Sequence, residues 1–534
     1  MIVLGNQDNG TRNVKVWPIR RKEKQLVSPL ILELPGFWRW PTISALFLLT
    51  LVPALPLLTE ASGTAATVAG NVFAAALGNT LVVAAMATIT AFAFGLPIGV
   101  ALSVYEFPGR RFLGSALVLP LLLPPFLLAL GWTMLLGPSL AGPFGAALVF
   151  SVWIMPLVAF AAYAAGKGLS ATAIEAARLA GGERRVVILM ARYASVPGLA
   201  AAGLGAALSI SDPGPGQVFG LPTAASEILT SFAALNDFGL AARQSLLVAV
   251  VIVFVAAPLA WFTAPRMARA LMAREVRQSH RRCARGLLSL ATFGLGFLIV
   301  TAVLLPILGL TFPATSNGAE WFPRALSEAA RTAGNTVLYA SGAGLIAVFL
   351  GFVLALAVGR DAGRQRFVIA ACFFVLCLPP ALLNLGLIRI TAAVPAWTDP
   401  IFRSQFAMCL VLGLRVFPIA AVLALRSWAS AAPSWTHAAA LHGVSLPVYA
   451  RRILVPHLLP AATAAFMLCG LLALADIGTA LLLHPPGAAS FPLAIFTVMA
   501  NAPEALVAWL ALVYVGTAAI FLLGASRLVE GRRT

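Results

Sequence analysis

Long apolar stretches that are almost free of charge dominate this chain, and they restrict its fold more than any other feature. A helix needs roughly 20 apolar residues to cross the hydrocarbon core of a membrane. Twelve stretches meet this requirement: 42–60, 80–105, 113–136, 143–165, 194–212, 244–264, 287–311, 336–358, 367–387, 404–425, 457–480 and 506–526. We therefore expect an all-α polytopic membrane protein with about twelve transmembrane helices. The proline-rich stretches, such as 113–136 with Pro120, Pro124 and Pro125, are candidates for broken helices.

The composition excludes a water-soluble globular protein. Of the 534 residues 60% are hydrophobic and only 10% are charged, and the mean hydropathy is +0.95. The net charge of +18 would suggest a nucleic-acid partner in a soluble protein. Here the positive charge is divided into short runs between apolar stretches, which is typical of the cytoplasmic loops of a membrane protein. The expected partner is a lipid bilayer and not a nucleic acid.

The distribution of positive charge also predicts the orientation. Most of the 36 Lys and Arg residues lie in the N-terminal tail, in the connections after even-numbered stretches, or at the C-terminus. The positive-inside rule then places both termini in the cytoplasm of a bacterial inner (cell) membrane. Residues 1–41 are polar and basic, too long and too charged for a cleavable signal peptide, and are expected to be a retained cytoplasmic tail.

An internal duplication divides the apolar part into two halves. Short sequences recur in unchanged order at offsets of 255 to 262 residues: Gly78-Asn79-Thr80 with Gly334-Asn335-Thr336, Pro124-Pro125 with Pro379-Pro380, and Ala176-Ala177 with Ala438-Ala439. The predicted units are a first half at 42–265, a cytoplasmic linker at 266–286 that holds seven arginines, and a second half at 287–534. Because six spans are an even number, both halves should have the same orientation, with a pathway at their interface.

Two loops on the predicted cytoplasmic side carry a family resemblance. After the fourth stretch the chain has Glu175-Ala176-Ala177 followed by Gly181, and after the tenth it has His437-Ala438-Ala439 followed by Gly443, Ile453 and Pro456. Both loops resemble the Glu-Ala-Ala loop of ABC (ATP-binding-cassette) importer permeases. The second loop departs from the family pattern at His437 and Val455, and the first departs at Ala191 and Ala194.

The resemblance implies a role for these loops in binding another subunit. Small residues let a second protein approach a helix closely, and a glycine lets the chain turn between two short helices. In the family, such a loop seats in a cleft of a cytoplasmic ATPase, so two ATPase copies and a periplasmic substrate-binding protein are the implied partners. No GxxxxGK[ST] motif occurs, and ATP hydrolysis is expected from the separate subunit. No catalytic residue, cofactor or metal site is expected in this chain.

The substrate hypothesis rests on the same resemblance. A single chain with both halves resembles the ferric-iron and thiamine permease group. Asp212 and Asp476, in Ser211-Asp212-Pro213-Gly214 and Ala475-Asp476-Ile477-Gly478, look like the Asp-x-Gly element of its iron-type members. This favours iron(III), with thiamine, polyamines and phosphonates as alternatives. The two carboxylates are expected either to line a cation path or to cap broken helices.

Two further polar features lie within or beside the apolar stretches. Arg415 lies midway along the tenth stretch, at the position equivalent to Trp153. A guanidinium at this depth needs a partner, which is either Asp476 or carbonyl groups of a broken helix in the second half; the helical rise favours the carbonyls. Asn79 and Asn335, at the starts of their stretches, are expected to be helix caps or interhelical hydrogen bonders.

Two other classes of function compete with the importer hypothesis. A major facilitator transporter also has twelve spans in two parallel halves, and short basic loops lie at 107–111 and 359–366. Such a transporter has no use for the repeated loops after the fourth and tenth stretches. An enzyme is disfavoured because the five histidines are scattered and form no HExxH motif.

Overall fold

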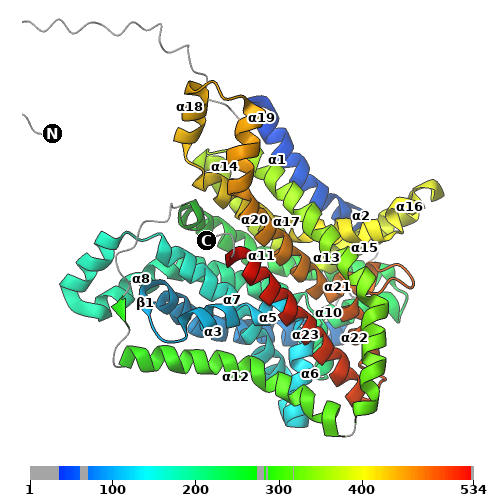
Figure 1. Cartoon of the computed structure of the whole chain (residues 1–534). Coiled ribbons are helices and arrows are strands. Elements are labelled where there is room, and N and C mark those ends of the chain that lie inside the picture. Colours follow the sequence, from blue (N-terminus) through cyan, green and yellow to red (C-terminus); the bar gives the residue numbers. More distant parts are fainter. Residues whose placement is uncertain (1–34, 61–69, 273–281, 284–286, 317, 531–534) are drawn as a thin grey trace, which may run out of the picture.

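The computed structural model describes residues 35–60, 70–272, 282–283, 287–316 and 318–530, and this part of the chain is almost entirely helical (Figure 1). Of the predicted 1–41 tail, the structure describes residues 35–41. Most of the predicted linker and the last four residues also lie outside the described residues. The described strands are β1 (Tyr105–Glu106) and β2 (Arg282–Cys283), which pair in parallel.

The helices follow one another in two series. The elements up to residue 272 are α1 (Gly36–Leu51), η2 (Val52–Ala54), α2 (Leu55–Glu60), α3 (Asn71–Val104), α4 (Arg110–Ala116), α5 (Leu119–Leu122), α6 (Pro125–Leu136), η3 (Gly137–Leu140), α7 (Pro143–Lys167), α8 (Ala171–Ile210), α9 (Gly214–Val218), α10 (Ala224–Ala233) and α11 (Phe238–Met272). The later elements are α12 (Leu287–Ser316), η4 (Ala319–Trp321), α13 (Phe322–Val358), α14 (Ala362–Cys377), α15 (Pro380–Ala393), η5 (Ala396–Thr398), α16 (Asp399–Phe402), α17 (Gln405–Ser430), α18 (Pro433–Leu441), α19 (Leu446–Tyr449), η6 (Ala450–Leu454), α20 (Val455–Ala475), α21 (Ile477–Leu483), α22 (Phe491–Val498) and α23 (Glu504–Glu530).

The helices have the length and composition of a polytopic membrane protein. Among the described residues, eight helices are long and apolar enough to cross a membrane, or nine if the bent pair α14 and α15 is one span. Three shorter apolar helices lie at 125–140, 302–316 and 504–520. Each of the twelve predicted stretches overlaps one of these segments, and the prediction of an all-α polytopic membrane protein is confirmed.

Prolines interrupt one helix at equivalent places in the two halves. In the first half the break precedes Pro125, which starts α6, and in the second half it precedes Pro380, which starts α15. Proline fits the first position of a helix because the N–H that it lacks has no partner there. The stretch 367–387 is therefore not one straight span, since α14 and α15 differ in direction by 80°.

The two halves interlock through their first helices. The segment α1–η2 packs against α13 and α15 of the second half, and α12 packs against α6 of the first half. Gly386 of α15 faces the Pro53 carbonyl, and Gly131 of α6 faces the Pro306 carbonyl of α12, so closely that a Cβ at either glycine would clash. These contacts are equivalent in the repeat, and each half holds the first helix of the other.

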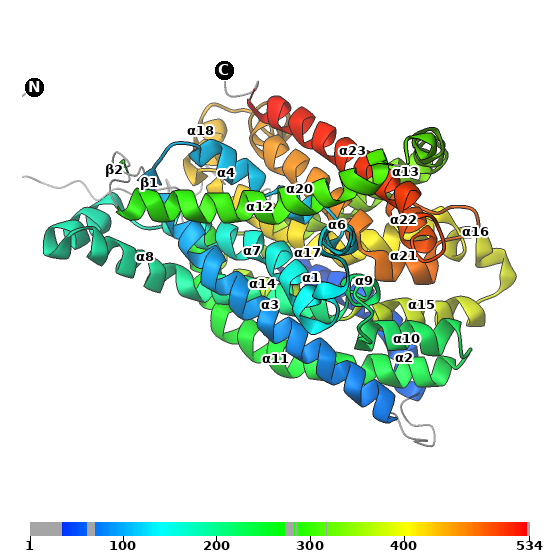
Figure 2. The same ribbon diagram turned by 90° about the horizontal axis from the view of Figure 1, so that it is seen from below.

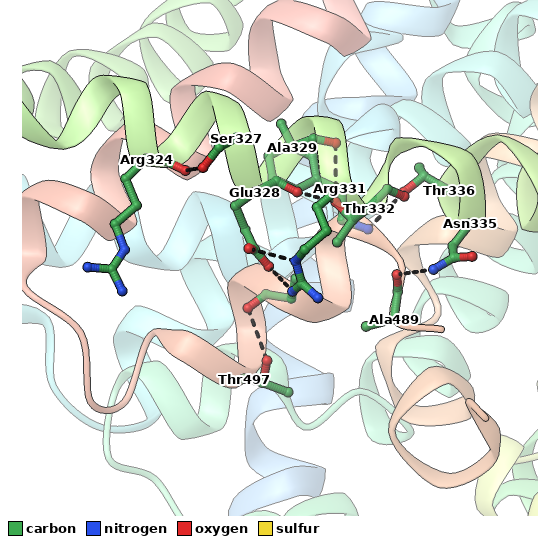
Figure 3. A network of polar contacts seen from close by, with 12 residues as sticks. Arg324, Ser327, Glu328, Ala329, Arg331, Thr332, Asn335, Thr336, Ala489 and Thr497 are labelled. Carbon is green, nitrogen blue, oxygen red and sulfur yellow. Dashed lines mark hydrogen bonds and ion pairs between the residues drawn. The ribbon is translucent and has the colours of Figure 1, made fainter. Parts of the chain in front are cut away.

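The repeated Gly-Asn-Thr sequences make matching hydrogen bonds. The hydroxyl of Thr80 accepts from the Ala224 N–H at 2.9 Å, and that of Thr336 accepts from the Phe491 N–H at 2.8 Å. The Asn79 amide donates to the loop carbonyl of Pro222 at 3.2 Å. The Asn335 amide donates to the loop carbonyl of Ala489 at 3.2 Å (Figure 3). Of the two predicted roles, the helix cap is wrong, because α3 and α13 begin about two turns or more earlier, at Asn71 and Phe322. The interhelical hydrogen bond is formed at Asn335, whose Oδ1 accepts from the Gln405 amide of α17 at 2.8 Å.

The repeated loops lie at one end of the molecule. Figures 1 and 2 both place α18 and the bend of α8 at the left, and α10, α16 and α22 at the right. The strand pair β1–β2 also lies at the left end, next to α8 (Figure 2). The helix bundle between the two ends separates the loops from α16 and α22.

Candidate functional site

A cavity of about 110 Å³ lies between the two halves. Its walls are built from equivalent positions of the repeat: Leu121 with Leu376, Trp153 with Arg415, Leu157 with Ile419, Leu208 with Leu472, Ser211 with Ala475, and Asp212 with Asp476. The two Asp-containing segments meet here, because a Cβ at Gly478 would lie 3.9 Å from the Ser211 carbonyl oxygen. The cavity is therefore lined by residues that the predicted repeat makes equivalent.

A polar network surrounds Asp476 in the second half. Its Oδ2 lies 2.7 Å from Nε of Arg415, and both side chains are at most 13% exposed. Asp476 also accepts from the backbone N–H of Thr479 at 3.0 Å and from its hydroxyl at 2.9 Å. The Asn384 amide donates to that hydroxyl at 3.0 Å. Asp476 is thus both the cap of α21 and the counter-ion of Arg415.

Arg415 uses both of the partners that the sequence offered. Besides its contact with Asp476, its Nη1 donates to the Leu378 carbonyl at 2.9 Å, at the break between α14 and α15. The sequence favoured the carbonyl over the carboxylate, because a continuous helical rise placed Asp476 about 10 Å nearer the periplasmic side. The direct pair forms because α20 ends at Ala475, so Asp476 lies at a helix break instead of continuing the span.

The first half lacks this network. Trp153, Pro215 and Ala129 stand where the second half has Arg415, Thr479 and Asn384. The Oδ1 of Asp212 accepts from the Gly214 N–H at 2.7 Å, which is a cap-like contact. No basic side chain in the described part of the chain lies within ion-pair distance of Asp212. Both halves therefore have a carboxylate at the equivalent position, but only the one in the second half has a cation beside it.

The first repeated loop is held by ionic contacts. The chain bends within α8 at Gly182, which has a φ of 66°, while the predicted turn residue Gly181 beside it is extended. Arg178 pairs with Glu175 at 2.7 Å and with Glu183 at 2.6 Å. Tyr105 donates its hydroxyl to Glu183 at 2.7 Å. Burial, and then this hydrogen bond, raise the pKa of Tyr105, so the phenol stays a donor at neutral pH.

The second repeated loop is held mainly by apolar packing. Gly443 has a φ of 65° and separates α18 from α19. Ala439 packs inward with Trp428 and Tyr449, while its neighbour Ala438 is exposed. The predicted pattern residues Ile453 and Pro456 are exposed where η6 meets α20. In the first loop Ala177 likewise packs inward and Ala176 is exposed.

One pair of equivalent residues escaped the sequence analysis. Leu179 is 90% exposed and Leu441 is 73% exposed, each two residues before the glycine that the pattern predicted. A single exposed leucine needs no explanation. Two exposed leucines at repeat-equivalent positions give two loops at one end of the molecule the same apolar surface residue. Their common offset of 262 residues was the signal that would have revealed them.

No protein-family profile and no solved structure matches the chain. A probable molybdenum ABC transporter permease protein of Haloferax volcanii is 30% identical over 186 residues, which cover 31% of this chain and 69% of that protein. This chain belongs to the ABC transporter permease family. Membership of the ABC permeases separates it from the major facilitator alternative. The ABC permease also contains, among its described residues, no group of three or more His, Cys, Asp or Glu that could hold a metal ion.

Proposed function

We propose that this ABC permease is the complete membrane-spanning pathway of an ATP-driven importer, with both halves fused in one chain. The observation that carries the proposal is the cavity between equivalent walls of the two halves, combined with two equivalent loops at one end. Two copies of one cytoplasmic ATPase would bind these loops. A periplasmic binding protein would deliver the substrate to the opposite end. The membrane would be a bacterial inner membrane, with both termini, the 1–41 tail and the 266–286 linker in the cytoplasm.

The substrate that we propose is iron(III). Asp212 and Asp476, which the sequence associates with iron-type permeases, both line the cavity, and carboxylates are ligands that suit hard cations. Thiamine, polyamines and phosphonates are the other substrates that the sequence resemblance allows. The name of the Haloferax volcanii relative supports a second candidate, a molybdenum substrate.

Replacement of the exposed leucines tests the docking of the ATPase. We expect Leu179→Ser and Leu441→Ser each to reduce copurification of the ATPase and coupled uptake, because each removes an apolar contact worth about 1–2 kcal/mol when buried. Both side chains are exposed in the chain alone, so the fold should be unaffected. Leu235→Ser is the matched control for ATPase copurification, since Leu235 is 63% exposed near the end of α10, at the other end of the molecule.

The two leucine variants should differ in strength. The first loop is fixed by Arg178 and Tyr105, whereas the second is held by packing around Ala439. A preorganised loop loses less conformational entropy on binding, so the single change in the second loop should weaken coupling more. Full transport by the double variant would contradict the proposal, and equal effects of the single variants would contradict the asymmetry.

A further inference from the structure

When Asp212 is ionised, the charges of the cavity do not cancel. Three ionisable side chains line it, namely Asp212, Arg415 and Asp476. Arg415 and Asp476 neutralise each other at 2.7 Å. Asp212 is left with one backbone N–H as its described partner. A carboxylate enclosed at membrane depth is costly unless a cation or a proton compensates it.

The repeat shows which compensating group is missing. Arg415 on α17 reaches the Asp of its own half, and Trp153 occupies the equivalent place on α7 and lines the same cavity. An arginine at position 153 would therefore be placed to pair with Asp212, as Arg415 pairs with Asp476. The residue that is present has no charge, and its indole ring attracts cations through its face.

We infer that Asp212 is a specificity-determining residue that selects a cationic substrate. The uncharged Trp153 leaves the Asp212 carboxylate without a protein counter-ion. The inference rests on the proposed import function and narrows its substrate class to cations. An entering cation supplies the charge that the first half lacks. An oxyanion such as molybdate would meet an excess of negative charge, because Arg415 is already bound to Asp476 and to the Leu378 carbonyl.

The decisive variant restores the symmetry of the cavity. Trp153→Arg adds the missing cation without removing a carboxylate, and Asp212→Asn removes the charge with almost no change of shape. Uptake of radiolabelled ferric iron and of radiolabelled molybdate is measured in cells whose chromosomal copy carries each variant. Gly78→Ala is the control outside the cavity, because nothing lies within 4 Å of a Cβ there. The amount of the chain in the membrane and of ATPase that copurifies with it reports folding and assembly.

We expect Trp153→Arg and Asp212→Asn each to lower ferric uptake by about tenfold or more, because both remove the uncompensated charge at membrane depth. Gly78→Ala should stay within about threefold of the wild type, because it leaves the charges of the cavity unchanged. Asp212→Asn decides the question if Trp153→Arg fails to accumulate, since it is isosteric.

Two results would overturn the inference. One is wild-type ferric uptake by Asp212→Asn, and the other is a wild-type chain that imports molybdate and not ferric iron. A different result concerns the proposed function: if deletion of the chain changes the uptake of neither ion, the import of these substrates is refuted in the wild type, before any variant is compared.

Discussion

At the scale of single residues, the chain contains one ion pair whose cost and benefit are both large. Arg415 and Asp476 are almost fully enclosed within the membrane-spanning part. Such a pair often adds little net stability compared with an apolar pair of the same shape, but removing one partner leaves a charge without compensation. Asp476 keeps its bonds from Thr479 in that case, whereas Arg415 would keep only the Leu378 carbonyl.

The pair can be tested by a double-mutant cycle. Arg415→Leu and Asp476→Asn should each lower the free energy of unfolding by about 3–5 kcal/mol, and the double variant should lose less than the sum of the two. Arg415→Leu should also be more harmful than Trp153→Leu, because the change at Trp153 creates no new unpaired charge. Thermal unfolding of the purified chain in detergent measures all four variants. Strictly additive losses would show that the contact at 2.7 Å does not couple the two residues.

At the scale of helices, close backbone contacts hold the two halves together. Gly131 lets α12 approach α6, and Gly386 lets η2 approach α15. Small residues have this role in membranes because tight packing, and not exclusion of water, drives the association of helices there. The sequence did not reveal these glycines, since the contact is made by a segment more than 100 residues away.

Replacement of glycines by alanine distinguishes the effect of close packing on stability from the effect of helix propensity. Gly131→Ala and Gly386→Ala should destabilise the chain by about 1–3 kcal/mol, because the new methyl group meets a carbonyl group of the other half. Gly78→Ala is the control within a helix, since nothing lies within 4 Å of a Cβ there. Alanine favours a helix by about 1 kcal/mol over glycine, so the control should be neutral or stabilised. The free energy of unfolding is measured in detergent. Equal values for all three variants would show that the interlocking contacts do not stabilise the chain.

At the scale of the whole molecule, the sequence predicts the architecture well and the cavity only in part. Apolar length and charge bias are local signals, so the helical membrane fold and the positions of the twelve stretches follow from the sequence. The sequence also singled out Asp212, Asp476 and Arg415 as ionisable residues at membrane depth. Their pairing did not follow, because it depends on helix breaks at Asp476 and Leu378 that propensity alone does not place.

Cysteine labelling of intact cells tests the orientation of the whole chain. The sequence predicts that Ser316 is periplasmic and that the linker, including Ser279, is cytoplasmic; Ser279 lies outside the described residues. Ser434 on α18 is exposed and serves as the second cytoplasmic site. With Cys283 replaced by serine, Ser316→Cys should react with an impermeant maleimide, and Ser434→Cys should react only after the cells are opened. The reverse pattern would invert the proposed topology.

The odd number of ionisable side chains in the cavity requires that the two halves differ in sequence. Two identical halves around a twofold axis can present only even numbers of each side chain to a shared space, because every substitution in one copy appears in the other. This cavity holds two carboxylates and one guanidinium, so an odd count is reached. In a single chain, the residues that line the cavity from each half can change independently. Every molecule then contains one copy of each half. In the fused chain that we propose, the unbalanced charge is therefore inherited as one unit.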